Sequence, residues 1–229
     1  MPADSEKLLA AEKAVALVQD GMMVGLGTGS TAAHAVRLLG QRVAEGLKIK
    51  GVPTSEATRK LARECKVPMT GLKEAGRLQI TIDGADEVDP QLRLIKGGGG
   101  ALLREKIVAS ASDMLVIVAD SGKLVQELGA FPLPVEIVPF ALPVVTPAIA
   151  ALGAKVTLRG GETAPFVTDE GHFILDCAFK RIEDPEGLAV TLSGIPGVVE
   201  HGLFLGMAER VILGRKGEAK TFRRKASKG

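Results

Sequence analysis

The chain has 229 residues, of which 46% are hydrophobic and 24% are charged, and its formal net charge is +2. This is the composition of a soluble globular protein with one large domain or two modest ones. A net charge this small does not indicate a nucleic-acid partner. Its two cysteines, Cys65 and Cys177, lie far apart in the sequence, which argues against a disulfide scaffold and a zinc site and fits a reducing compartment.

The first residues of the chain combine early charges with apolar residues at helical spacing. They lack the apolar core of a signal peptide, and nowhere does the chain reach the roughly 18 uninterrupted apolar residues of a membrane span. We therefore expect a cytoplasmic protein with no membrane partner. Residues 5–21 are predicted to form a helix, with Ser5 as its cap and Gly21 at its end.

Short apolar strands then alternate with helices up to residue 120. The predicted strands are residues 22–27, 47–53, 77–83, 92–97 and 114–120, and the predicted helices lie within residues 28–46, 54–65 and 101–112. Strands that alternate with helices indicate parallel βαβ units. The first half of the chain is therefore predicted to form a Rossmann-like doubly wound sheet.

The pattern changes at residues 131–145, whose four prolines indicate a domain boundary. The elements that follow are predicted strands 135–138, 154–159, 172–179 and 197–204 and predicted helices 147–153 and 184–194. Their order, βαββαβ, is the ferredoxin-like pattern. Residues 208–214 are a predicted strand that could return to the first sheet.

We therefore expect an α/β protein with two domains. Residues 1–130 and 207–229 form the Rossmann-like domain, and residues 131–206 form a smaller inserted ferredoxin-like α/β domain. Residues 214–229 contain seven Lys and Arg residues and one Glu, which leaves 22 basic and 26 acidic residues in the rest of the chain. Such a tail is typical of a solvated terminus, and a nucleic-acid role would need further support.

Four unusual loops follow predicted strands, and in open α/β sheets ligands bind at the carboxyl ends of strands. The loops are GTGST (27–31), DGADE (83–87), KGGGG (96–100) and DSGK (120–123). Two of them lead into helix N-termini, where free N–H groups and the helix dipole attract anions. Hydroxyl and ammonium donors stand in the same loops at Thr28, Ser30, Thr31 and Lys123.

The first loop is best suited to a single phosphate. Its glycines, at positions 25, 27 and 29, do not match G-x-G-x-x-G, and the loop lacks the lysine of a P-loop. A dinucleotide site is therefore disfavoured. The alternative is a tight strand-to-helix turn that binds nothing.

The second loop contains three acids, Asp83, Asp86 and Glu87, which cannot all be buried without partners. They could bind a hard cation, form a polar turn or accept hydrogen bonds from sugar hydroxyls. Glu105, in the first turns of the helix after the glycines, either favours the helix dipole or acts as a general base. The histidines, His34, His172 and His201, belong to no motif, and we expect them to be structural or at the surface.

Taken together and in order, several segments resemble ribose-5-phosphate isomerase of the A type. They are GLGTGSTA, TIDGADEVD, IKGGGGALLREKI, ADSGK, FPLPVEIVP and IPGVVEHGLF. The resemblance implies an enzyme without metal or cofactor that interconverts D-ribose 5-phosphate and D-ribulose 5-phosphate in the non-oxidative pentose phosphate pathway. It also implies a Rossmann-like domain with a smaller α/β domain, assembled as a homodimer or a higher homo-oligomer.

The resemblance also implies roles for single residues. Glu105 matches the proton-transferring base, and Lys96 matches a polar residue at the reacting end of the sugar. Asp83 is the candidate for ring opening, with Asp86 second. The residues that match the substrate-binding loops are Thr28, Gly29, Ser30, Thr31, Asp83, Gly84, Ala85, Asp86, Lys96, Gly97, Gly98, Gly99 and Lys123, with Lys7 as a further phosphate contact.

Two departures from the family pattern are Gly100, where alanine is also expected, and the long basic tail. Two other functions remain open. An amino-sugar phosphate deaminase would share the fold but bring a different set of acidic and His residues. A non-catalytic sugar-phosphate sensor normally has a DNA-binding domain and need not keep Glu105.

Overall fold

The computed structural model of the chain describes residues 2–224. By its internal contacts the chain divides into two compact units. The sheet unit comprises residues 1–85, 104–123 and 206–229, and the small unit comprises residues 86–103 and 124–205. That residues 131–206 form an inserted domain stays a prediction. Between residues 2 and 224 there is no helix long and apolar enough to span a bilayer.

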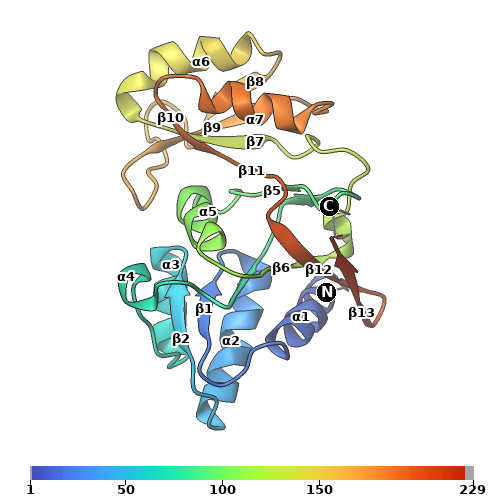
Figure 1. Cartoon of the computed structure of the whole chain (residues 1–229). Coiled ribbons are helices and arrows are strands. Elements are labelled where there is room, and N and C mark those ends of the chain that lie inside the picture. Colours follow the sequence, from blue (N-terminus) through green and yellow to red (C-terminus); the bar gives the residue numbers. More distant parts are fainter. Residues whose placement is uncertain (1, 225–229) are drawn as a thin grey trace, which may run out of the picture. The chain divides into compact units, whose positions relative to one another are not determined.

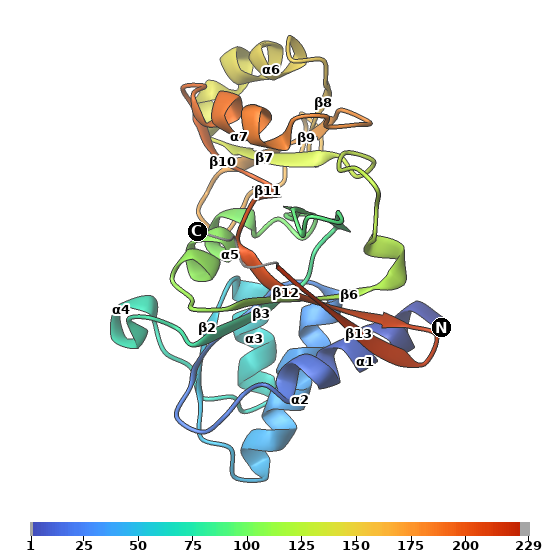
Figure 2. The same ribbon diagram turned by 45° about the vertical axis from the view of Figure 1, so that its right-hand side comes forward.

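The sheet unit is built on a six-stranded, mostly parallel sheet (Figures 1 and 2). Its strands are β1 (Met23–Leu26), β2 (Lys50–Pro53), β3 (Ile80–Asp83), β6 (Leu115–Asp120), β12 (Ala208–Arg215) and β13 (Glu218–Arg223), in the order β13-β12-β6-β3-β1-β2. Neighbours from β2 to β12 run parallel, and β13 runs antiparallel to β12. The return of residues 208–214 to the first sheet is thereby confirmed.

The helices of this unit cover both faces of the sheet. They are α1 (Pro2–Val15), α2 (Ser30–Ala44), α3 (Glu56–Glu64), α4 (Leu72–Ala75), α5 (Leu102–Ser110) and the 3₁₀ turn η1 (Ser121–Lys123). Val24 and Leu26 pack in the core cluster that α1 and α2 share. Gly25 points the other way, because strand side chains alternate, and a Cβ there would lie 2.8 Å from Val108 of α5. The predicted doubly wound architecture is confirmed.

The small unit contains a four-stranded antiparallel sheet. Its strands are β7 (Leu133–Ile137), β8 (Lys155–Leu158), β9 (Phe173–Ala178) and β10 (Val198–His201), and its helical segments are η2 (Pro139–Ala141), α6 (Leu142–Ala150) and α7 (Pro185–Ser193). The strand order β10-β7-β9-β8 with antiparallel neighbours is the ferredoxin-like arrangement predicted from the sequence. Both helices lie on one face of this sheet (Figures 1 and 2).

One predicted strand of the main sheet is wrong. β5 (Leu94–Ile95) pairs with β4 (Glu87–Val88) and β11 (Leu203–Phe204) in a separate antiparallel sheet of the small unit. The cause is a tight turn, in which the carboxylate of Asp89 accepts the N–H groups of Gln91 and Arg93, both at 2.9 Å. Such an Asx turn reverses the chain at once, and strands joined so closely must run antiparallel.

The expected start and end of the first helix are also wrong. Ser5 lies inside α1 rather than before it, and the helix ends at Val15 rather than near Gly21. Within the basic tail, residues 218–223 form β13, a strand whose side chains are exposed or half-buried. Lys216 and Gly217 both have positive φ, 48° and 82°, as the two central residues of a type I′ hairpin turn require. Residues 225–229 of the tail lie outside the described part of the chain.

Candidate active site

The loops after β1 and β3 lie where the strand order of the sheet reverses. β1 pairs with β2 on one side and with β3 on the other, and the parallel register joins Leu26 to Ile82. The chain therefore leaves β1 and β3 at one edge of the sheet, with β6 next to β3. Such a switch point is the usual ligand-binding position of an open α/β sheet.

Asp83, the last residue of β3, is fully buried and has a fixed carboxylate. Its Oδ1 accepts the N–H groups of Thr28 at 3.1 Å and Gly84 at 2.7 Å. A Cβ on Gly27 would lie 2.5 Å from the Cα of Asp83, so the two loops can meet only because residue 27 is glycine. The main chain thus fixes the orientation of this carboxylate.

The hydroxyl of Thr28 takes part in a cluster that the sequence did not reveal. Its Oγ1 lies 2.8 Å from the hydroxyl oxygens of Thr54 and Ser55 and 3.1 Å from that of Thr58. Thr58 in turn donates to the carbonyl of Gly27 at 2.9 Å. These bonds tie the loop 27–31 to the start of α3, and its proposed phosphate donors are then mainly Ser30, Thr31 and the main chain.

The N-terminus of α2 fits an anion. Its N-cap is Gly29, with φ of 103°, and in the described chain no side chain caps this helix end. The N–H groups of the first turn therefore lack the partner that Ser, Thr or Asp would supply at this position. Ser30 is exposed and Thr31 is 8% exposed, so hydroxyl groups stand in the same turn.

Lys123 ends η1, which directly follows β6. The turn is held by Glu6 of α1, whose carboxylate accepts the N–H of Ser121 at 3.0 Å and its hydroxyl at 2.8 Å. The N–H of Lys216 adds a third bond at 3.2 Å. The hydrogen bond from the Ser121 main chain is the first cause that lowers the pKa of Glu6.

Glu105 lies in the first turn of α5 and is 4% exposed. The residue before it, Arg104, donates to Glu56 at 2.9 Å, and Glu56 also pairs with Arg59 at 3.2 Å. The bond from Arg104 is the first cause that lowers the pKa of Glu56. The ion pair anchors the turn that carries Glu105, and the helix dipole favours a carboxylate there.

In the small unit, Asp86 contacts the glycine loop. Its N–H donates to the carbonyl of Ile95 at 2.8 Å, and its Oδ2 accepts the N–H of Gly98 at 2.7 Å. A Cβ on Gly98 would lie 2.6 Å from the Oδ1 of Asp86, which explains glycine at this position. The sequence-predicted residues Asp86 and Gly98 are thus brought into direct contact.

Lys96 precedes the glycines and is only 2% exposed. Its N–H donates to the carbonyl of Gly202 at 2.9 Å, and its Nζ lies 5.3 Å from the ring centroid of Phe204. A cation over an aromatic face is stabilised by about 2 kcal/mol or more when desolvated. The ring therefore helps to keep an ammonium group in a buried position.

Some polar residues of the predicted loops have purely structural partners. The carboxylate of Glu87 accepts the N–H groups of Gly129 at 2.7 Å and Phe131 at 2.5 Å, and so anchors a distant loop.

The three histidines lie outside the predicted loops. His34 lies 3.0 Å from Asp4. His172 likewise lies 3.0 Å from Glu136, and His201 is 6% exposed. Among residues 2–224, no group of three or more His, Cys, Asp or Glu side chains is arranged to hold a metal ion.

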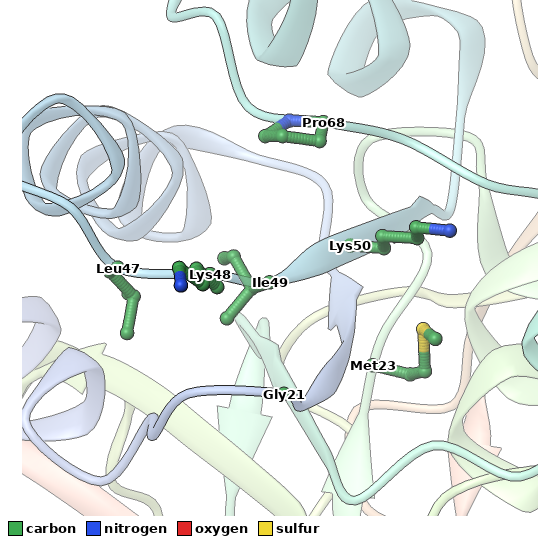
Figure 3. A pocket seen from close by; sticks show the side chains of 7 residues that line it. All are labelled: Gly21, Met23, Leu47, Lys48, Ile49, Lys50 and Pro68. Atoms are coloured by element: carbon green, nitrogen blue, oxygen red, sulfur yellow. The ribbon is translucent and has the colours of Figure 1, made fainter.

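A cavity of about 450 Å³ lies elsewhere in the sheet unit (Figure 3). Its lining is Gly21, Met23, Leu47, Lys48, Ile49, Lys50 and Pro68. Met23 and Lys50 are the first residues of β1 and β2, so this cavity lies at the amino ends of the strands. The catalytic candidates of the sheet unit lie at the carboxyl ends, and the cavity is therefore not part of their site.

Comparison with known sequences identifies one family. The sequence profile described as Ribose 5-phosphate isomerase A (phosphoriboisomerase A) matches residues 50–218. A ribose-5-phosphate isomerase A of Bradyrhizobium diazoefficiens is 53% identical, with 100% of each chain covered. One of Rhodopseudomonas palustris is 56% identical, with 93% of this chain and 95% of the relative covered.

Solved structures of this family have the same fold as the chain. A D-ribose-5-phosphate isomerase in complex with phospho-erythronic acid has a TM-score of 0.94 at 39% identity, covering 98% of this chain and 100% of that one. The enzyme of Methanocaldococcus jannaschii has a TM-score of 0.90 at 43% identity, covering 95% and 97%. With its sequence, its loops and its fold in agreement, the chain belongs to the ribose 5-phosphate isomerase A family.

Proposed function

We propose that Glu105 moves the proton in the interconversion of D-ribose 5-phosphate and D-ribulose 5-phosphate, the aldose–ketose isomerisation of this family. The reaction removes a proton from the carbon next to the carbonyl and returns it one carbon away. One carboxylate can perform both transfers if the enediolate stays bound. The observation that carries this proposal is the buried carboxylate of Glu105, in the first turn of the helix that directly follows the glycine loop.

The developing oxyanion needs donors that are already in place. Lys96 supplies an ammonium group held under the Phe204 ring, and the glycine loop supplies main-chain N–H groups. The glycines at 97 to 99 have no side chains to keep a ligand away from the backbone. We assign these groups to the reacting end of the sugar, because charge develops there.

Ring opening requires an acid–base group, since the substrate is mostly a furanose. We assign this step to Asp83, whose carboxylate is fixed by two N–H donors, and keep Asp86 as the second candidate. The phosphate is assigned to the first turn of α2, with Ser30 and Thr31, and to Lys123. Lys7 on α1 stays a further candidate. That a relative was solved with phospho-erythronic acid, a phosphorylated sugar acid, supports an anionic sugar as the ligand.

We also propose that the chain acts as a homodimer or higher homo-oligomer, in the cytoplasm, within the pentose phosphate pathway and without a cofactor. Support for assembly comes from the small unit, where Phe140 is 93% exposed, Val190 of α7 is 74% exposed and Val144 of α6 is 64% exposed. Apolar side chains that protrude so far indicate an interaction surface.

The experiment that tests the proposed function is an isomerase assay of the purified chain with ribose 5-phosphate in the presence of EDTA. We expect ketose to form at an undiminished rate. Activity that is lost in EDTA and restored by a divalent ion would contradict a metal-free mechanism. A complete lack of ketose formation under all conditions would contradict the function itself.

A further inference from the structure

Arg159, the residue after β8 in the small unit, contacts the back of the glycine loop. One guanidinium nitrogen, Nη1, donates to the carbonyls of Gly97 at 3.0 Å and Gly98 at 3.3 Å. Nε and Nη2 bind the two carboxylate oxygens of Asp176 in β9, at 3.0 and 2.5 Å. The guanidinium is therefore neutralised by a bidentate carboxylate and directed at the loop by it.

Phe166 supports the same arrangement from the other side. Its ring lies 5.8 Å from the Arg159 guanidinium, and its N–H donates to the carbonyl of Arg159 at 2.8 Å. A Cβ on Gly100 would lie 2.4 Å from the tip of this ring, so the backbone of the loop packs directly on it. Gly100 also has a φ of 81°, which favours glycine at this position.

The Gly97 carbonyl is held by Arg159 and by the Gly100 N–H, which donates to it at 2.9 Å, whereas the Gly98 carbonyl is held by Arg159. These contacts orient the N–H groups of the loop. The peptides are trans, and in a trans peptide the C=O and the N–H point in opposite directions. Because the Gly97 carbonyl faces Arg159, the Gly98 N–H faces away from it, and this N–H meets Asp86 at 2.7 Å. The Gly98 carbonyl also faces Arg159, so the Gly99 N–H is directed to the side on which Asp86 lies.

We propose that Arg159, oriented by Asp176 and packed on Phe166, is a positioning residue that presents the Gly99 N–H and the Asp86 carboxylate to the sugar. The inference rests on the proposed function, in which this loop stabilises the enediolate. A charged donor at a carbonyl also polarises its peptide group, which makes the attached N–H a stronger donor. Arg159 itself does not contact the substrate in this arrangement, because its donors are directed at the loop and at Asp176.

The test compares Arg159→Ala with Arg181→Ala. Arg181 is the matched control because it pairs with Glu127 at 2.6 Å in the same unit and does not contact the glycine loop. For each variant, kcat and KM for ribose 5-phosphate are measured, together with inhibition constants for phospho-erythronic acid and inorganic phosphate. Circular dichroism and thermal unfolding establish that each variant is folded.

For Arg159→Ala we expect kcat to fall by about 10–10²-fold, somewhat less than the about 10²–10³-fold that follows removal of an oxyanion donor itself. Phospho-erythronic acid should bind more weakly by a similar factor, because in our proposal its carboxylate takes the place of the reacting end of the sugar. Inorganic phosphate and the control variant should stay within about twofold of wild type. Millimolar guanidinium ion should partly restore kcat of Arg159→Ala and leave the control unchanged, which a purely structural role does not predict.

The inference is overturned if folded Arg159→Ala keeps kcat within about twofold of wild type. It is also overturned if the variant's affinity for inorganic phosphate falls as much as its affinity for phospho-erythronic acid. If Arg159→Ala does not fold, kcat is measured for Asp176→Asn instead. This variant keeps the size of the side chain and removes the charge that orients Arg159. An unchanged kcat in that variant overturns the inference, and a fall of about 3–10-fold supports it. An inactive wild-type chain would overturn the proposed function, and with it this inference.

Discussion

Glu105 is the residue on which the proposed chemistry depends most. Glu105→Gln keeps the size of the side chain and removes its basic electron pair. General base catalysis contributes about 10²–10⁴-fold, so we expect kcat to fall by at least about 10²-fold with both substrates, while KM changes little. If Glu105 merely favours the helix N-terminus, the variant loses only about 0.3–1 kcal/mol and stays active. Steady-state kinetics in both directions distinguish the two roles.

Asp83→Asn is the contrasting variant. The amide oxygen can still accept the N–H groups of Thr28 and Gly84, so the loops should keep their geometry. If Asp83 opens the ring, this variant should be slow with ribose 5-phosphate and recover with ribulose 5-phosphate, which cannot close through its esterified C5 oxygen.

For Glu105→Gln, near wild-type turnover would refute the assignment of Glu105 as the base and would point to Asp86 instead.

Lys123 is assigned to the phosphate and not to the chemistry. Lys123→Ala should therefore raise KM for ribose 5-phosphate and leave kcat nearly unchanged. Ribose without its phosphate should be a very poor substrate of the wild-type chain. Similar kcat/KM values for ribose and ribose 5-phosphate would contradict the anion site at the start of α2 and in η1.

Single residues could be predicted from the sequence only where a short motif contains them. Asp86 and Gly98 lie within two adjacent motifs, and the sequence marked both residues without predicting the hydrogen bond between them. The glycine-loop partners of Arg159, Gly97 and Gly98, lie 62 and 61 positions away, and Glu6 and Ser121 are 115 positions apart. No local pattern marks such pairs, because only the folded strands bring them together.

At the scale of elements, Glu6 joins α1 to η1 and to the turn after β12. Its lowered pKa means that the folded state favours the carboxylate, so the stabilisation is present above the ordinary value of 4.5 and is lost as pH falls through the lowered pKa. Glu6→Gln should therefore have a lower Tm than wild type at neutral pH, and the difference should disappear in acid. Thermal unfolding across pH 3–7 measures this; a difference in Tm that grows on acidification would contradict it.

The rate at which Cys177 is alkylated measures how tightly β9 is packed. Burial raises the pKa of its thiol to about 12, and burial also raises the pKa of the half-buried Cys65. At pH 8 a thiol with pKa near 12 is only about 10⁻⁴ thiolate, and Cys177 is fully buried, so it is protected by both its pKa and its lack of exposure. Iodoacetamide should therefore alkylate Cys65 in the folded chain and both cysteines after denaturation. Rapid alkylation of Cys177 in the folded chain, detected by peptide mass spectrometry, would show that β9 is more open than the structure indicates.

Elements were predictable from the sequence where hydrophobic periodicity was long enough. β6 and α2 follow their patterns closely, because a buried strand and an amphipathic helix leave clear signals. The hairpin of β4 and β5 was missed, because two-residue strands carry almost no periodicity. β13 was not predicted, because its polar and basic sequence lacks the apolar pattern of a buried strand. An exposed edge strand tolerates such a composition.

At the scale of the whole molecule, the proposed homo-oligomer can be tested at a single exposed side chain. If η2, α6 and α7 form the subunit interface, Phe140→Asp in η2 should convert the oligomer to a smaller species at micromolar concentration. Val167→Asp is the control, since Val167 is 56% exposed in the same unit but lies outside these helices. Light scattering coupled to size-exclusion chromatography gives the masses. A wild-type chain that is monomeric, or a Phe140→Asp variant of unchanged mass, would contradict this interface.

The fold class of the whole molecule was predictable because the order of elements constrains topology. Strands that alternate with helices form parallel crossovers, and βαββαβ closes into an antiparallel sheet of defined order. The division of the chain was harder to predict. Residues 86–103 lie in the small unit although they precede the proline-rich boundary, because β5 pairs with β11 over 100 positions later.

The strand β13 has a consequence for how the protein behaves when it is cut or stored. β12 is largely buried and would otherwise form the last strand of the main sheet. An apolar strand with an unpaired edge is a template for aggregation, whereas β13 presents Lys220 and Arg223 along the outer edge. The basic tail therefore shields the sheet from a second molecule. A chain cleaved after Gly217 would keep every residue of the proposed active site and yet be prone to precipitate.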